Sequence, residues 1–215
     1  SLKKYSNINS EKIRIGLVQG NVEQFMKWNP AYQNLVINKY RKLTFKAAEE
    51  KPHLIIWPET ATPFYFEESE TETHMMRNLA REINTPILFG SPHRKKINGE
   101  LVYFNSAYLL SQSGETLSRY DKIHLVPFGE FVPPGFRWFV DALNIPLGDF
   151  NRGSTRQELF TLNEQVIAPN ICYEDVFGEE IVTALGDSEQ YGPGATMLVN
   201  VSNLAWFGDT WALQQ

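Results

Sequence analysis

The sequence predicts an α/β protein in which helices cover mixed sheets. Up to residue 90, short apolar runs alternate with helical patterns, the β-α-β-α-β rhythm of a largely parallel sheet. Two later strand patterns flank Ser-Gly-Glu at 113–115, a turn that makes this part of the sheet antiparallel. With 215 residues, 42% of them apolar, the chain is long enough to bury one core, so we expect a single globular domain.

The first half of the chain carries the clearest periodicity. Residues 1–12 are polar and aperiodic, which is typical of a leading tail. The next run stops at Gly20-Asn21, a turn signal, and the first helical pattern stops at Lys51-Pro52. The predicted elements are a strand over 13–19, a helix over 31–50, a strand over 54–57, a helix over 70–83 and a strand over 86–90.

The second half continues with strands and one long irregular stretch. We expect a hairpin of strands over 102–111 and 117–120, a loop rich in Pro, Gly and aromatic residues over 127–150, and buried strands over 166–172 and 196–200. The last ten residues resemble a loop entering a helix that has no stop signal. We therefore expect the chain to be truncated there.

The composition excludes several classes of protein. The net charge is −5 and the longest basic run is Arg94-Lys95-Lys96, which argues against nucleic acid as a partner. The single cysteine, Cys172, has no internal disulfide partner. No window reaches the roughly 20 apolar residues of a membrane-spanning helix, and no signal-peptide pattern opens the chain. This segment alone is therefore not expected to cross a membrane.

Three ionisable residues directly follow strand patterns, where α/β folds present reacting groups. They are Glu59, Lys122 and Cys172. A carboxylate can take the proton of a thiol, and a lysine can stabilise the oxyanion that forms when the thiolate attacks a carbonyl. The three residues together would be sufficient for acyl transfer.

Each of these residues also has an ordinary structural interpretation. A lone cysteine is more often a small buried hydrophobe than a nucleophile. Glu59 follows Pro58 and could cap the next segment, whereas a lone lysine such as Lys122 is most often a solvated surface charge. Taken separately, none of the three identifies a catalytic site.

Taken together, the segments resemble the nitrilase superfamily of carbon–nitrogen hydrolases and, within it, the apolipoprotein N-acyltransferase family. The resemblance covers nearly the whole chain. It implies an αββα sandwich, with residues 13–215 as the catalytic domain lacking its C-terminal part, and with residues 1–12 as a tail or linker from a membrane segment. The motifs are Val18-Gln19-Gly20-Asn21 with Lys27-Trp28, Trp57-Pro58-Glu59-Thr60-Ala61, Tyr120-Asp121-Lys122, His124 to Glu130, Cys172-Tyr173-Glu174-Asp175, and Asn200-Val201-Ser202-Asn203 with Ala205 to Asp209.

The resemblance also implies roles for individual residues. Glu59, Lys122 and Cys172 match the catalytic triad. Two further acidic residues of the site are matched by Glu130 and Glu174, the backbone N–H of Tyr173 matches an oxyanion donor, and Trp28 matches an aromatic residue at the substrate entrance. The sequence departs from the family pattern at Glu23, where Pro is frequent, and at Leu204, where Asp is common.

The activity implied by the resemblance is lipoprotein maturation. A fatty acyl group would move from a phospholipid donor to Cys172 as a thioester, and then to the N-terminal amine of a diacylglyceryl-cysteine apolipoprotein. The full-length protein would lie in the inner membrane, with this domain on the periplasmic side. The histidines have no metal-ligand spacing, so we expect no metal and no cofactor.

Two other features are ambiguous. The aromatic stretch over 131–139 could be a lid or membrane contact, because Pro133-Pro134-Gly135 prevents a regular element there, or it could pack inward. His124 could support Lys122 or be purely structural.

Two rival functions remain. A soluble amidase of the same superfamily would use the same triad and pass the acyl group to water. A catalytically inactive binding or assembly domain would have no chemical need for all three triad residues.

Overall fold

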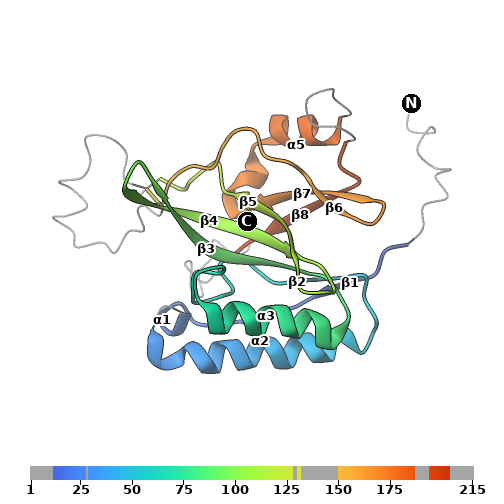
Figure 1. Ribbon diagram of the computed structural model, residues 1–215. Helices are drawn as coiled ribbons and strands as arrows, with labels where there is room; N and C mark the ends of the chain where they lie inside the picture. The colour runs from blue at the N-terminus through green and yellow to red at the C-terminus, as the bar shows by residue number, and fades with distance from the viewer. Residues whose placement is uncertain (1–11, 28, 128–129, 132–149, 187–193, 204–215) are drawn as a thin grey trace, which may run out of the picture.

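The computed structural model describes residues 12–27, 29–127, 130–131, 150–186 and 194–203, and these form four layers. Figure 1 shows α2 and α3 beneath one sheet, a second sheet above it, and α5 on the outer side of the second sheet. The α/β class and the αββα arrangement are therefore confirmed.

The elements are β1 (Ile15–Leu17), α1 (Gln24–Lys27), η2 (Pro30–Tyr32), α2 (Gln33–Ala48), β2 (Leu54–Ile56), α3 (Glu70–Ile83), β3 (Ile87–Ile97), β4 (Glu100–Leu110), β5 (Thr116–Asp121), β6 (Phe160–Leu162), β7 (Gln165–Ile171), η3 (Cys172–Val176), α5 (Gly178–Leu185) and β8 (Met197–Val201).

The first sheet has five strands in chain order, β1 to β5. β1, β2 and β3 are parallel, whereas β3, β4 and β5 are joined as antiparallel hairpins. Because β4 reverses the direction and β5 reverses it again, β2, β3 and β5 all end at the same edge of the sheet. Side chains that follow β2 and β5 are thereby brought together.

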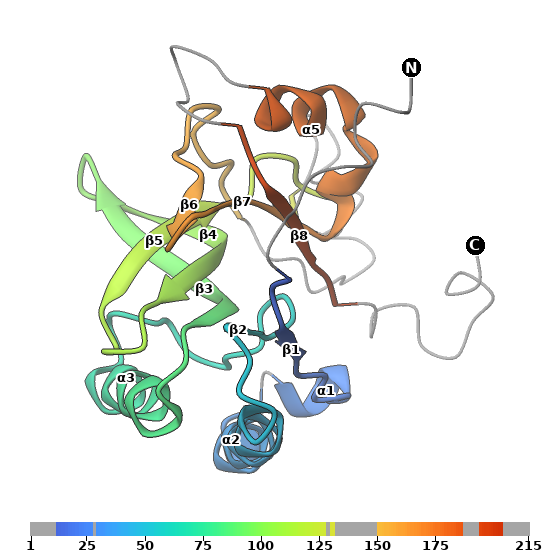
Figure 2. The ribbon, with the colours of Figure 1, turned by 90° about the vertical axis from the view of Figure 1, so that its right-hand side faces the viewer.

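The second sheet has three strands, with β7 between β6 and β8. β6 and β7 form an antiparallel pair, and β7 and β8 are parallel. Figure 2 shows this sheet packed across the first one, with α5 on its far side. Since β7 and β8 end together, the residues that follow them also share one edge.

Two apolar clusters hold the layers together. One lies between the first sheet and the helices, where Tyr40, Trp57 and Phe89 pack with Met76 and Leu79. The other lies between the two sheets and draws on both, with Leu54, Leu88 and Leu109 on one side and Phe160 and Ile171 on the other. The sandwich therefore depends on apolar burial on both faces of the first sheet.

The structure also corrects several predicted elements. The strand predicted over 86–90 runs on to Ile97, because the turn that reverses it is Asn98-Gly99. Both turn residues have positive φ, 51° and 91°, as a two-residue hairpin turn requires. The strand predicted over 166–172 ends at Ile171, and Cys172 begins η3 instead. The sequence analysis did not predict α1, β6, η3 or α5.

Several predictions lie wholly or mainly outside the described residues. They concern the tail over 1–12, the loop over 127–150, Leu204 and the final helix. None of the helices in the described ranges combines the length and the apolar character that a bilayer crossing requires.

Candidate active site

The Glu59 turn, residues 58–60, begins two residues after β2 ends. Thr60 has a φ of 44°, a left-handed conformation that β-branched residues adopt at a cost of about 1–3 kcal/mol. Strand β3 passes directly beneath this turn: a Cβ on Gly90 would lie 2.6 Å from Cα of Glu59 and would also collide with the backbone nitrogen of Thr60. Only glycine lets the strand approach so closely, and this approach sets the position of Glu59.

The ammonium group of Lys122 lies between two carboxylates. Lys122 follows β5 directly and its side chain is 0% exposed. Its Nζ lies 3.4 Å from Oε1 of Glu59 and 2.8 Å from Oε2 of Glu130. Burial by itself would lower the pKa of Lys122, but the charges of Glu59 and Glu130 outweigh it and raise the pKa. Lys122 therefore remains a cation at neutral pH.

Asn105 connects the same two carboxylates from inside strand β4. Its Nδ2 donates to Oε1 of Glu59 at 2.7 Å and to Oε1 of Glu130 at 2.8 Å. This bonding fixes the orientation of the amide, because the reverse orientation would place its oxygen against two carboxylates. Glu130 is held further by the backbone N–H of Val126 at 2.9 Å. Two acidic side chains thus share one cation and one neutral donor.

The second sheet supplies the nucleophile candidate. Cys172 directly follows β7 and has a φ of 53°, so the chain turns sharply at this residue. Asn200, the residue of β8 that pairs with Asn170, donates to the carbonyl oxygen of Cys172 at 3.0 Å. The half-buried Cys172 therefore lies at the edge of the sheet.

The pKa of the Cys172 thiol is affected by burial and by four neighbouring side chains. Burial raises the pKa of the thiol, and the negative charges of Glu59 and Glu130 raise it further. A hydrogen bond from Ser202 and the positive charge of Lys122 act in the opposite direction. The net shift is upward, so the resting group is a protonated thiol that needs a base when it attacks.

Glu59 also bridges the two sheets. Its Oε2 accepts a hydrogen bond at 2.9 Å from the backbone N–H of Asn203, just beyond β8. Because its Oε1 is held by Lys122 and Asn105, both oxygens of this 5% exposed carboxylate are oriented by the protein. The structure therefore brings together Glu59, Lys122, Cys172 and Glu130.

Glu174 accepts hydrogen bonds mainly from backbone N–H groups that adjoin Lys122 and Cys172 in the chain. It is 2% exposed, and its Oε1 accepts from the backbone N–H groups of Ile123 at 2.6 Å and His124 at 3.1 Å. Oε1 also accepts from the Tyr120 hydroxyl at 3.0 Å, and Oε2 accepts from the backbone N–H of Ile171 at 2.8 Å. Burial raises the pKa of Glu174, and the backbone donors partly offset the shift. This carboxylate joins the segment after Lys122 to the residue before Cys172.

The remaining predicted residues have different surroundings. Tyr173 is exposed, and its ring packs edge-on against Phe177. Nε2 of His124 lies 2.6 Å from Oε1 of Glu180 in α5, and the His124 ring stacks on Phe177. Both contacts fit the structural interpretation of this histidine. Trp28 lies outside the described residues, as does most of the 131–139 stretch.

Four groups of the site were given no role by the sequence analysis: Asn105, Lys27, Ser202 and the backbone N–H of Asn203. Lys27, Ser202 and Asn203 stood in quoted motifs, whereas Asn105 lay inside a predicted strand without any motif. In the described ranges, no three His, Cys, Asp or Glu side chains are grouped closely enough to hold a metal ion.

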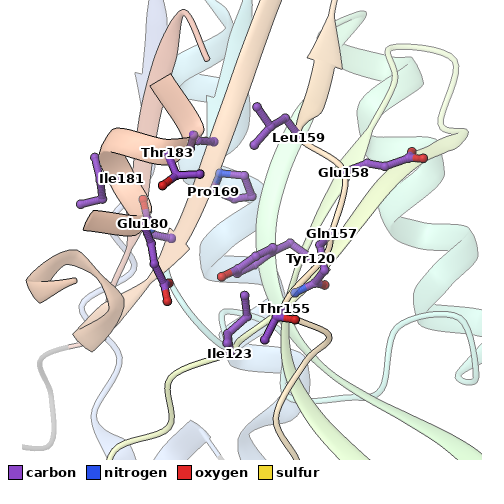
Figure 3. Close-up of a pocket in the computed structure, with 13 residues that line it drawn as sticks. Tyr120, Ile123, Thr155, Gln157, Glu158, Leu159, Pro169, Glu180, Ile181 and Thr183 are labelled. Atoms are coloured by element: carbon purple, nitrogen blue, oxygen red, sulfur yellow. The ribbon is translucent and has the colours of Figure 1, made fainter. Parts of the chain in front are cut away.

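A pocket lined in part by α5 is separate from this group. Figure 3 shows Tyr120, Gln157 and Glu180 among the residues that line it, between α5 and the segment before β6. None of Glu59, Lys122 and Cys172 lines the pocket. The acidic, basic and thiol groups therefore form their own site at the strand ends.

This arrangement is suited to attack on a carbonyl carbon. The charges of Glu59 and Lys122 both act on the Cys172 thiol, and a carboxylate, a cation and a thiol are the groups that such an attack requires. The elements that position these groups come from both sheets, so the site exists only when the sandwich is assembled.

Comparisons with known proteins agree with this geometry. Residues 14–214 match the carbon–nitrogen hydrolase family. The apolipoprotein N-acyltransferase of Bordetella bronchiseptica is 44% identical over 98% of this chain and 41% of its own length. The apolipoprotein N-acyltransferase of Ralstonia nicotianae is 43% identical over 94% of this chain and 37% of its own length. The chain thus spans about two fifths of the length of the curated relatives it matches.

Solved structures share the fold at much lower sequence identity. An amidase from Nesterenkonia sp. has a TM-score of 0.64 and 18% identity, covering 96% of this chain and 70% of the amidase. A carbon–nitrogen hydrolase from Helicobacter pylori G27 has a TM-score of 0.62 and 18% identity, covering 88% of this chain and 59% of that protein. At this identity the likeness concerns the fold alone.

Proposed function

Because this chain belongs to the carbon–nitrogen hydrolase family, we propose that Glu59, Lys122 and Cys172 catalyse acyl transfer through a thioester on Cys172. The observation that carries the proposal is the Lys122 ammonium held between Glu59 and Glu130, with the charges of Lys122 and both carboxylates acting on the Cys172 thiol. The names of relatives at 39–44% identity support apolipoprotein N-acylation as the reaction.

The first half-reaction forms the acyl-enzyme. The sulfur of Cys172 attacks an ester carbonyl of a phospholipid while Glu59 takes the thiol proton. Lys122 and the backbone N–H of Tyr173 stabilise the oxyanion. The ester C–O bond then breaks, and the lysophospholipid leaves with the proton held by Glu59.

The second half-reaction transfers the acyl group to an amine. The α-amine of a diacylglyceryl-cysteine apolipoprotein attacks the thioester, Glu59 receives a proton from the amine, and the C–S bond breaks. An amide forms and the proton returns to Cys172. Glu130 keeps Lys122 in place throughout, and Glu174 fixes the two strand ends from which Lys122 and Cys172 project.

We assign the catalytic unit to residues 13–215, with residues 1–12 as a tail or linker from a membrane segment. In the full-length protein this unit would lie on the periplasmic side of the inner membrane, where a phospholipid donor and a lipoprotein acceptor are both within reach. Trp28 would contact substrate at the entrance.

The test is intact mass spectrometry of the full-length protein in detergent after incubation with phospholipid alone. We expect an added fatty acyl mass that hydroxylamine removes, with Cys172→Ala abolishing the adduct. Cys172→Ser distinguishes the linkage, because an acyl-serine ester resists hydroxylamine more than a thioester does. Absence of the acyl adduct together with hydrolysis of small amides would replace the transferase with an amidase.

A further inference from the structure

Lys27, the last residue of α1, is a buried lysine that the proposed chemistry does not use. Its side chain is 5% exposed. Its Nζ donates to the hydroxyl oxygen of Thr60 at 2.6 Å and to the carbonyl oxygen of Glu59 at 3.1 Å. Among the ion pairs of the described residues, none involves Lys27, although its charge interacts with that of Glu59. A buried ammonium group thus contacts the turn that carries the base.

The Glu59 turn needs external support. Thr60 is held in a left-handed conformation, and the turn is pressed against Gly90 of β3, whose N–H donates to the carbonyl oxygen of Pro58 at 3.2 Å. Those contacts restrain the turn from the side of the sheet. Lys27 restrains it from the α1 side, at two oxygen atoms, the carbonyl oxygen of Glu59 and the hydroxyl of Thr60.

A purely structural role would not require a charge at this position. Burying an ammonium group without a bonded carboxylate destabilises the fold, whereas methionine has a similar length and no charge to bury. An apolar side chain would fill the same space but could not bond to the two oxygens of the turn.

We propose that Lys27 is a positioning residue that fixes the direction in which the Glu59 carboxylate points. The proposal rests on the proposed role of Glu59 as the base. Through the Glu59 turn, Lys27 determines whether Oε1 reaches Lys122 and Asn105 and whether the carboxylate faces the thiol. A displacement of about 1 Å at a reacting group is enough to cost about 100-fold in rate.

The test compares Lys27→Met, Lys27→Arg and Thr60→Val in the full-length protein. Lys39→Met is the matched control, because Lys39 is exposed and donates to a single backbone carbonyl of Asn21 at 3.4 Å. The reaction is the burst of p-nitrophenol released from p-nitrophenyl butyrate by Cys172. This activated ester reports the attack of the thiol whatever the natural acyl donor is.

We expect Lys27→Met to lower the maximal burst rate about 100-fold while the ester KM changes less than twofold. Thr60→Val should cost about tenfold, because it removes one of the two acceptors. Lys27→Arg, which keeps both charge and donors, should recover at least part of the rate. The thermal midpoint of Lys27→Met should equal or exceed that of the wild type.

Two results would overturn the proposal. One is a Lys27→Met burst rate equal to that of Lys39→Met, and the other is a rate loss that follows a fall in the folded fraction. The phospholipid assay on the wild type is run in parallel. If the wild type forms no acyl adduct from phospholipid but still shows the Cys172 burst, the proposed transferase fails while the role of Lys27 is still decided.

Discussion

Asn105 donates from its Nδ2 to Oε1 of Glu59 at 2.7 Å, from the middle of a strand that faces the Glu59 turn. The same nitrogen donates to Glu130, so one neutral amide holds two acidic side chains beside Lys122. Glu59, the proposed base, is therefore oriented by a residue that takes no proton itself.

Replacing Asn105 should change the orientation of Glu59 without changing the charge of the site. Asn105→Leu has nearly the same volume but no donor, so we expect the rate of Cys172 acylation to fall about 100-fold with little change in KM. Single-turnover kinetics measure this rate. Asn78→Leu, in α3, is the control, and an unchanged rate in Asn105→Leu would show that Glu59 is oriented without the Asn105 amide.

Removing the cation should destabilise the fold as well as stop the reaction. Lys122→Met leaves the buried Glu59 and the half-buried Glu130 without the cation between them, which we expect to lower the free energy of unfolding by about 3–5 kcal/mol. Lys122→Met/Glu130→Gln removes one of the negative charges and should regain much of that stability while remaining inactive. Denaturant unfolding and burst kinetics report the two effects separately. Recovery of activity in the double variant would refute the role of Lys122.

The reactivity of Cys172 should depend on pH in a defined direction. Because burial raises the pKa of this thiol, its alkylation by iodoacetamide should be slower at pH 7 than that of free cysteine and should increase at higher pH. Ser202→Ala should move the alkylation midpoint further up, because the hydrogen bond from Ser202 lowers the pKa. Mass spectrometry of the alkylated protein across pH 6–11 gives both midpoints. A downward shift in Ser202→Ala would contradict the assigned hydrogen bond.

Lys27 should produce a window in which stability rises with pH. Burial lowers the pKa of Lys27 from 10.5 to about 8, so below pH 8 the folded protein carries a buried charge. Between about pH 8 and 10.5 the folded form loses this proton while the unfolded chain keeps it, so the penalty of about 3 kcal/mol is progressively relieved. The difference in free energy of unfolding between wild type and Lys27→Met isolates this group. A difference that stays constant across the window would show that the pKa is not lowered.

Gly90 should be intolerant of a single methyl group. A Cβ there would collide with the backbone of the Glu59 turn, so Gly90→Ala must displace either the turn or strand β3. We expect loss of most acylation activity and a fall of about 1–3 kcal/mol in the free energy of unfolding. Gly99→Ala adds a methyl group at the open β3–β4 turn, where nothing lies within 4 Å, so this control should leave activity intact despite the positive φ at that position.

Most of the strands, the two long helices and the three candidate residues were predictable because all of them depend on local pattern. Apolar runs mark strands, and Glu59, Lys122 and Cys172 each follow one directly or within a few residues. The reversal of β3 was missed because Pro92 and the basic residues after it conceal a strand, although Asn98-Gly99 is a hairpin signal. Cys172 was assigned to a strand because its left-handed conformation leaves no trace in side-chain pattern.

The supporting contacts of the site were not predictable in the same way. Asn105 is separated from Glu59 by 46 residues in sequence, and Asn203 by 144, so their proximity depends on how the sheets stack. Glu174 was expected near the site, but a sequence does not reveal that a carboxylate accepts mainly backbone donors. Partners of this kind emerge only when the topology is known.

The division of the site between two sheets has a consequence for biosynthesis. The base and the cation belong to segments that leave the ribosome first, and the thiol emerges only after the first sheet can fold. A nascent chain that stalls before β7 carries the charged groups but no thiol. A chain that stalls after Cys172 but before β8 exposes a thiol whose base still lacks the Asn203 contact. Reactivity is therefore expected to develop only after strands of both sheets have been synthesised.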